Sequence, residues 1–252
     1  MGKKGGDKRL KRMKAPAFWP IPRKRDLWTA KPSPGPHRSS RCLTLLTVIR
    51  DILNLTKTYK ETRMVLSEEK VKVDGKSRRD MKFPIGVMDV VEIPDAESYY
   101  RILPSRKGLT LHSVDREEAV FKLCRIENKS SLDEALFQLN LHDGRNIIVG
   151  DKEAEEQDHL ASNMKTFDVL KIGMPRQELL DHLSFDVGSY AIVTEGKNAG
   201  RHGKVVAIDR EHGLRPKIVT LEDVSGNNFQ TILEYVFAIG IEEPWISLPE
   251  VT

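Results

Sequence analysis

The sequence predicts an α+β protein of several domains. Residues 1–41 are rich in proline and basic side chains and cannot bury a core of their own. Residues 42–93 have the pattern of two helices followed by two strands, an αα–ββ module. Residues 94–182 and 183–252 are mostly short strands separated by glycine turns. A chain of 252 residues is long enough for one to three such domains behind a basic arm.

The arm, residues 1–41, holds most of the positive charge. It carries 13 Lys and Arg against two Asp, whereas the remaining residues carry 28 Lys and Arg against 35 Asp and Glu. A basic arm on a mildly acidic body is typical of a protein that binds a polyanion. Nucleic acid is the first candidate, because cations that neutralise phosphates release counterions. Trp19 and Trp28 argue against an idle tail, since such rings stack on bases or dock on a partner.

The αα–ββ module follows from apolar spacing. Helical periodicity predicts one amphipathic helix over 42–55 and another over 59–68. Residues 71–76 then alternate as a strand whose Asp-Gly pair at 74–75 favours a tight turn, and the next strand is expected over 83–93. Lysines and arginines crowd around this hairpin, which therefore presents positive charge.

The central part is expected to be β-rich. Alternation and β-branched residues predict strands over 98–103, 109–114, 119–127, 136–141, 145–149 and 169–172. Strands joined by hairpin turns indicate a small barrel or sandwich. The charged run 151–158 has the composition of a solvated loop.

The last part contains a strand over 189–194 and then the glycine loop, residues 195–205. Gly196, Gly200 and Gly203 permit a positive φ and a close approach of the backbone to whatever lies against it. The loop is not a nucleotide-binding P-loop, because Val205 stands where Ser or Thr would follow Lys204. Its basic residues therefore favour contact with an RNA backbone.

Motifs for other functions are missing from the sequence. Its seven His have no metal-ligand spacing, its two Cys form no disulfide framework or zinc motif, and no nucleophile elbow appears. His142-Asp143 has the setting of an exposed turn. No secretory signal or run of 18 apolar residues is present. We expect no catalytic residue, metal, cofactor, small-molecule substrate or membrane partner.

Two segments resemble known RNA-binding modules. The hairpin stretch 71–76 with 83–90 resembles the S-four-type RNA-binding domain, and the stretch 185–203 resembles a KOW motif in an SH-three-like barrel. The arm contributes Leu10-Lys11-Arg12 and Gly35-Pro36-His37, and the chain closes on the stretch 244–249, Pro-Trp-Ile-Ser-Leu-Pro. In this order, the whole chain resembles the archaeal and eukaryotic e-type family of small-subunit ribosomal protein four.

The resemblance implies four parts: the arm 1–41, an S-four-type domain 42–93, a central small β-barrel-like domain 94–182, and a KOW domain with a C-terminal extension 183–252. It also implies a cytoplasmic, non-catalytic ribonucleoprotein component of the small ribosomal subunit, in contact with its ribosomal RNA and neighbouring ribosomal proteins.

Two alternatives stay open. A non-resident RNA-binding factor in ribosome assembly or transcription would use the same modules. An RNA-modifying enzyme would need a catalytic carboxylate in the central part, at Asp133, Asp143 or Asp168.

The residues expected to bind RNA are basic, or able to stack or donate hydrogen bonds, and lie on the arm, the αα–ββ module and the glycine loop. They are Lys3, Lys4, Lys8, Arg9, Lys11, Arg12, Lys14, Trp19, Arg23, Lys24, Arg25, His37, Arg38, Arg41, Arg50, Lys60, Arg63, Lys72, Lys76, Arg78, Arg79, Lys82, Lys197, Asn198, Arg201, His202 and Lys204.

Overall fold

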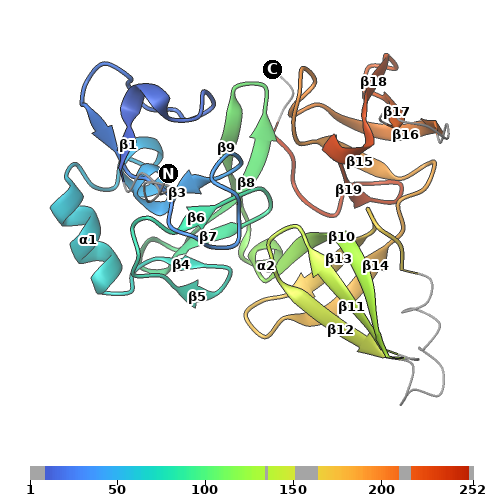
Figure 1. Ribbon diagram of the computed structural model, residues 1–252, viewed down its shortest axis with the longest axis horizontal. Helices are drawn as coiled ribbons and strands as arrows, with labels where there is room; N and C mark the ends of the chain where they lie inside the picture. Colours follow the sequence, from blue (N-terminus) through green and yellow to red (C-terminus); the bar gives the residue numbers. More distant parts are fainter. Residues whose placement is uncertain (1–8, 134–135, 151–163, 210–216, 250–252) are drawn as a thin grey trace, which may run out of the picture.

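The structure is a computed structural model that describes residues 9–133, 136–150, 164–209 and 217–249. In these residues the fold is mostly β, with three five-stranded sheets, two small two-stranded sheets and few helices (Figure 1). The acidic run 151–158 and the arm residues before Arg9 lie outside the described residues. None of the helices described is long and apolar enough to cross a membrane.

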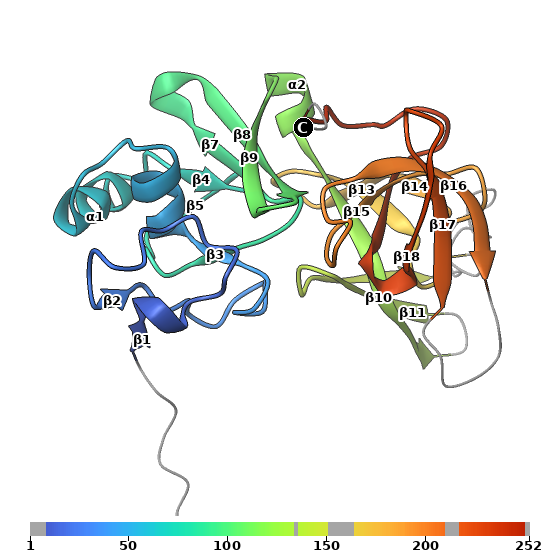
Figure 2. The same ribbon diagram turned by 90° about the horizontal axis from the view of Figure 1, so that it is seen from above.

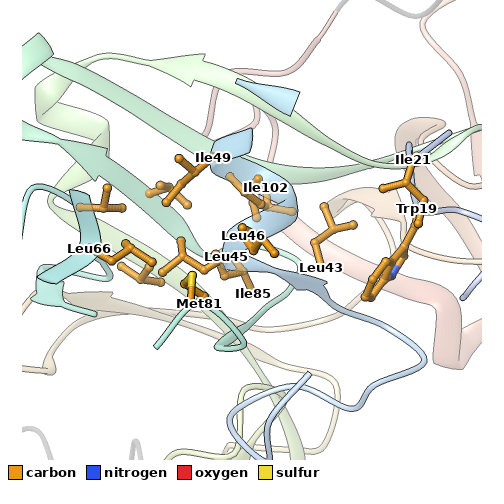
Figure 3. Packing of buried hydrophobic residues seen from close by; sticks show 14 of the residues in the cluster. Trp19, Ile21, Leu43, Leu45, Leu46, Ile49, Leu66, Met81, Ile85 and Ile102 are labelled. Carbon is orange, nitrogen blue, oxygen red and sulfur yellow. The ribbon is translucent and has the colours of Figure 1, made fainter. Parts of the chain in front are cut away.

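The arm is packed against the body rather than extended. Strand β1 (Leu10–Lys11) pairs with β2 (Trp28–Thr29), and a 3-10 turn, Arg12–Lys14, lies between them. Trp19 is only 3% exposed, and its indole N–H donates to the carbonyl oxygen of Cys42 at 2.8 Å. Figure 3 shows Trp19 and Ile21 beside the core residues of the next module. The arm therefore completes a core that it could not form alone.

The first expected helix is shorter than its apolar spacing predicts. Strand β3 (Leu43–Thr44) pairs with β6 (Pro84–Ile85), and the following Thr47–Ile52 forms a π-helical turn. The backbone N–H groups of Leu45 and Leu46 donate to Phe83 and Met81 at 3.0 and 2.9 Å. Pairing with a distant strand thus replaces the first turn of the predicted helix.

The second helix and the hairpin match their predictions. Helix α1 spans Tyr59–Ser67, close to the expected 59–68. Strands β4 (Lys72–Val73) and β5 (Lys76–Ser77) pair across a turn in which Asp74 and Gly75 have φ of 52° and 71°. Both values lie in the left-handed region that an Asp-Gly hairpin turn requires.

The hairpin belongs to a sheet that continues past residue 93. Its order is β5-β4-β7-β8-β9, with β7 at Val90–Ile93, β8 at Ser98–Ser105 and β9 at Gly108–Val114. A 3-10 turn, Pro94–Ala96, joins β7 to β8. Residues on both sides of the expected domain boundary at 93/94 therefore share one sheet.

The second sheet has the order β12-β11-β10-β13-β14 and follows the short helix α2 (Arg116–Ala119). Its strands are β10 (Phe121–Asp133), β11 (Leu136–Leu141), β12 (Asn146–Gly150), β13 (Val169–Gly173) and β14 (Glu178–Leu183). Strand β14 was not predicted, because most of its side chains are exposed and show no apolar alternation.

The third sheet is a curved, half-barrel sheet of order β18-β17-β16-β15-β19 (Figure 2). Its strands are β15 (Tyr190–Val193), β16 (His202–Asp209), β17 (Ile218–Glu222), β18 (Asn228–Ile232) and β19 (Val236–Gly240), with a 3-10 turn at Leu233–Tyr235. Ile246 of the C-terminal segment packs into a core to which all three five-stranded sheets contribute, with Leu103 of β8 from the first sheet.

A buried cluster of charges joins the first two sheets. Lys122, on β10, is 1% exposed and contacts carboxylates from two parts of the first module, Asp74 of the hairpin turn at 2.9 Å and Asp89 before β7. It also contacts Asp143, in the turn between β11 and β12, at 3.0 Å. Arg145 pairs with Asp143 at 3.0 Å and also with Asp74. We call these five residues the ionic junction.

Candidate nucleic-acid interface

Exposed cations gather on the arm and the first module. Apart from Arg9, whose guanidinium lies over the Trp28 ring, and Lys57, whose charge lowers the pKa of Glu61, nine exposed basic side chains there form no ion pair within the described residues. They are Lys11, Lys14, Lys24, Arg25, Arg38, Lys60, Arg63, Lys76 and Lys82. We call this set the basic face. Because no described carboxylate neutralises these cations, they are available to a polyanion.

Helix α1 carries two of these cations, Lys60 and Arg63, and a capping box fixes its start. The Thr58 hydroxyl accepts the N–H of Glu61, and the Glu61 carboxylate accepts the N–H groups of Lys57 and Thr58. The backbone hydrogen bond from Lys57 is the main cause that lowers the pKa of Glu61. With Thr62 and Leu66 buried on one side of the helix, Lys60 and Arg63 are exposed.

The hairpin and the segment after it contribute fewer exposed, unpaired cations than their number of lysines and arginines predicts. Arg79 pairs with Glu69, and the Arg78 guanidinium stacks on the Phe83 ring at 4.4 Å from its centroid. Lys72 is partly buried, whereas Lys76 and Lys82 are exposed.

A groove lies between the β1–β2 hairpin, the π-helical turn and the start of α1. It has a volume of about 330 Å³. Two aromatic rings, Trp28 and Tyr59, line it and are 43% and 48% exposed. Basic residues from the arm, the π-helical turn and the approach to β6 line it as well: Arg9, Lys31, Arg50 and Lys82. The groove therefore combines stacking surfaces with positive charge.

Several residues expected to bind RNA are used inside the protein. Arg12 is buried, donates to the Pro22 carbonyl oxygen at 2.9 Å and pairs with Asp26. The Arg23 guanidinium caps carbonyl oxygens of the turn Arg12–Ala17, including Ala15 at 2.7 Å. Together with buried Trp19, these residues hold the arm in shape, so their polar groups are not presented to RNA.

Three further predicted residues also have protein partners. His37 pairs with the buried carboxylate of Asp89 at 2.9 Å, which fixes the end of the arm to the first module. Arg41 pairs with Glu195 of the glycine loop, and Arg50 pairs with Asp51 at 2.8 Å.

The backbone of the glycine loop lies close to other backbone segments of the same chain. A Cβ on Gly200 would lie 2.6 Å from Ser105 Cα, and one on Gly203 would lie 2.0 Å from the Glu222 carbonyl oxygen. Close backbone approach was expected, but the neighbour is this protein's own backbone. These two glycines hold the loop against β8 and β17.

The polar side chains of the glycine loop are also largely occupied. Asn198 donates to the Gln230 carbonyl oxygen at 3.0 Å, and Arg201 pairs with Asp223 at 2.9 Å. His202 is 7% exposed, and its ring lies 2.8 Å from the Tyr190 hydroxyl. Only Lys197 and Lys204 of the five predicted loop residues are exposed.

The carboxylates considered for catalysis have structural partners. Asp143 belongs to the ionic junction; burial raises its pKa, but Lys122, His142 and Arg145 outweigh this and lower the pKa to about 2. Asp168 accepts hydrogen bonds from His182 and from the N–H groups of Lys165 and Phe185, which lower its pKa although burial opposes them.

The third carboxylate considered for catalysis, Asp133, has its side chain outside the described residues. In the described ranges, no group of three or more His, Cys, Asp or Glu is placed to hold a metal ion.

Sequence reasoning gave Trp28, Lys31 and Tyr59 no place in the RNA-binding set, although all three line the groove. The sequence indicates that the Trp28 ring stacks on bases or docks on a partner without separating the two, and Tyr59 begins the expected helix 59–68. They are 31 residues apart, so only the folded arrangement brings them to one groove. The signal available in the sequence was two large rings flanked by basic residues.

Exposed cations gathered on one part of a protein are typical of nucleic-acid-binding proteins. A family model described as Ribosomal family S4e matches residues 96–179, and one described as RS4NT (NUC023) domain matches residues 4–40. A small ribosomal subunit protein eS4 from Desulfurococcus amylolyticus is 48% identical over 251 residues, or 99% of each chain. The protein of the same name from Methanocaldococcus jannaschii is 44% identical over 98% of this chain and 100% of its own.

A solved structure agrees with these sequence matches. The crystal structure of the 30S ribosomal protein S4e from Thermoplasma acidophilum has a TM-score of 0.65 at 31% identity, and the match covers 79% of this chain and 95% of that one. The chain belongs to the S4e family of ribosomal proteins. The expected family is confirmed, and so is the expectation of a structural ribosomal protein that is not an enzyme.

Proposed function

We propose that this chain holds ribosomal RNA of the small subunit on the basic face of its arm and first module. As an S4e protein it is a structural, cytoplasmic component of the small ribosomal subunit and serves translation. Its setting there is among ribosomal RNA and other ribosomal proteins. The basic face is the part of the molecule that we assign to the RNA.

The observation that carries this proposal is the set of nine exposed cations without ion-pair partners in the described residues. They come from the arm, α1, the hairpin and the approach to β6, so several segments of the arm and the first module contribute exposed positive charge. Phosphate contacts by Lys and Arg supply most of the affinity of such interfaces and release counterions. The acidic balance of the residues after 41 limits RNA contact elsewhere on the surface.

The remaining predicted contacts divide by their partners. We keep Lys197 and Lys204 as contacts of a KOW-like loop, because both are exposed. We assign Arg12, Trp19, Arg23, His37, Asn198, Arg201 and His202 to holding the fold, because their polar groups have partners within the chain. Lys3, Lys4 and Lys8 lie outside the described residues and stay in the proposed set with the rest of the arm.

The four-part division also stays a proposal. In it, 42–93 is an S-four-type module, 183–252 is a KOW domain in an SH-three-like barrel, and the middle part is a small β-barrel-like domain. Residues 94–114 belong structurally with the first module, since β8 and β9 extend its sheet. We infer that the middle part faces neighbouring proteins or solvent rather than RNA, because its sequence is acidic.

Removing the whole arm would also remove Trp19 and Ile21 from the core, so the test uses charge removal instead. In the full chain, Lys11, Lys14, Lys24 and Arg25 are replaced together by Gln. Binding to small-subunit ribosomal RNA from the same cells is then measured over a range of salt concentrations. If all four touch phosphate, the log–log slope should fall by about 3, at about 0.7 to 0.9 per contact.

The matched control removes four exposed cations from other parts of the chain: Arg116, Lys165, Arg176 and Lys217. Its slope should stay near that of the unchanged protein. An equal loss of slope in both variants would mean that net charge, rather than the basic face, attracts the RNA. Release of the unchanged chain from small subunits in high salt would favour a non-resident factor over a resident protein.

A further inference from the structure

The groove next to the basic face is lined by aromatic as well as basic residues, and binding of phosphates does not require the aromatic ones. Its lining contains two aromatic rings, four cationic side chains and no carboxylate. Cations are sufficient to bind phosphates. Aromatic rings add a stacking surface for a base that has left its own stack. We propose that this groove binds one unstacked nucleotide of the RNA, with its base against Trp28 and Tyr59 and its phosphates near Arg50 and Lys82.

The two rings are exposed at the positions where a base would stack. Trp28 and Tyr59 are 43% and 48% exposed, whereas Trp19 of the same arm is 3% exposed and part of the core. The Arg9 guanidinium lies over the Trp28 ring, 5.7 Å from its centroid. This contact holds one face of the indole and adds a positive charge beside it. The groove therefore presents rings that the core does not use.

Three apolar side chains line the groove, and we call them its floor. Leu10 and Ala30 belong to the strand pair of the arm and its continuation, and Leu46 is a core residue with 3% exposure. A flat base can cover this floor without burying unpaired polar groups of the protein. The volume of about 330 Å³ lies in the range of sites that hold a small ligand.

We assign the phosphate to side chains rather than to the start of α1, because the Glu61 carboxylate in its first turn would repel an anion. The Glu61 carboxylate already accepts the N–H groups of Lys57 and Thr58 at the start of α1. Lys82 is exposed and has no described ion-pair partner, and Arg50 keeps donors beyond the two that bond Asp51. These two residues reach the groove from the approach to β6 and from the π-helical turn.

The inference rests on the proposed function, because it takes ribosomal RNA as the ligand. The first test compares two double variants of the full chain, Trp28→Leu with Tyr59→Leu, and Trp28→Phe with Tyr59→Phe. Stacking is worth about 1–3 kcal/mol per base, so the leucine pair should bind small-subunit ribosomal RNA about tenfold more weakly or worse. The phenylalanine pair keeps two stacking faces and should bind within about twofold of the unchanged chain.

Salt dependence separates the rings from the cations. The leucine pair removes no charge, so its affinity should fall equally at every salt concentration and the log–log slope should not change. Lys82→Gln should instead lower the slope by about 0.7 to 0.9. A lower slope in the leucine pair would show that the arm had shifted and lost phosphate contacts. The apolar control Ile148→Ala, at an exposed position on β12, should change neither quantity.

A second measurement uses the unchanged chain and does not depend on how any variant folds. Ultraviolet crosslinking in intact small subunits should attach a nucleotide to a peptide that contains Trp28 or Tyr59. Crosslinks at Lys60 or Arg63 with none at the two rings would overturn the groove and leave the basic face intact. Crosslinks from either ring to a neighbouring protein would overturn it in favour of a peptide site. Failure of the unchanged chain to bind ribosomal RNA at all would instead refute the proposed function.

Discussion

The cations of the basic face and the cations of the ionic junction are the same residue types in opposite surroundings. Lys60 is exposed on a helix and has no ion-pair partner among the described residues, whereas Lys122 is 1% exposed and contacts three carboxylates. An exposed cation is worth little to stability and is available to a ligand. A buried cation is costly to desolvate and becomes indispensable once carboxylates surround it. Counting charge along the chain does not separate these two roles.

The largest effect is expected at Lys122. Replacing it by Met removes the cation that faces Asp74, Asp89 and Asp143 and leaves these carboxylates buried together. Breaking a buried ion pair in this way costs about 3–5 kcal/mol. The free energy of unfolding, measured by urea denaturation, should fall by this amount, while the salt dependence of RNA binding by the folded fraction should not change.

Lys60→Met is the matched variant on the basic face. Its effect on the free energy of unfolding should stay within about 0.5 kcal/mol, and its effect should appear in the salt slope. Equal destabilisation by both substitutions would contradict the separation of binding charges from structural charges.

The second effect is an acid response from His142, which stands next to Asp143 of the ionic junction. Its Nδ1 lies 3.2 Å from the Arg125 N–H and its Nε2 lies 3.2 Å from the Val87 carbonyl oxygen. This pairing needs a neutral ring, with Nδ1 as acceptor and Nε2 as donor. Burial lowers the pKa of His142 to about 3, although Asp143 opposes the shift.

The lowered pKa makes stability depend on pH in a defined window. Above about pH 6.5 the ring is neutral in both the folded and unfolded states, and its contribution to stability is complete. As the pH falls towards 3, the unfolded state binds a proton that the folded state does not. Stability should therefore fall by up to about 1.4 kcal/mol per pH unit from this group.

The measurement is the free energy of unfolding between pH 7 and pH 4 for the unchanged chain and for His142→Gln. The glutamine variant should be less stable at neutral pH. Because glutamine does not titrate, the free energy of unfolding of this variant should change less with pH over this range. Parallel curves would mean that other groups, such as the carboxylates of the ionic junction, cause the acid response. A still steeper curve for the variant would contradict a neutral His142 in the folded state.

Much of the strand content could be predicted from the sequence, because alternation and turn residues act locally. The Asp-Gly turn at 74–75 and helix α1 are found where local signals place them. The shortened first helix could not be predicted, since its backbone N–H groups bond to residues almost forty positions away. Strand β14 lacks the alternation on which strand prediction depends.

The interface was harder to predict than the fold, because composition does not reveal partners. Trp19 and Trp28 stand nine positions apart in the same proline-rich arm, yet one ring is in the core and the other lines the groove. Arg23 has the composition of an RNA contact and instead caps carbonyl oxygens of its own turn. These differences arise from contacts that form only when the arm packs on the first module.

The smallest expected effect lies in the glycine loop, where both kinds of cation stand a few residues apart. Arg201 pairs with Asp223 and stacks on Phe229 at 4.0 Å, so Arg201→Gln should lower stability by about 1 kcal/mol or less and leave the salt slope unchanged. Lys197→Gln with Lys204→Gln should leave stability unchanged and lower the slope by about 1.4 if both touch RNA. Thermal melts and the same RNA-binding titration measure the two quantities. An unchanged slope in the lysine pair would confine RNA binding to the basic face, and the glycine loop would then act through its contacts with β8 and β17 alone.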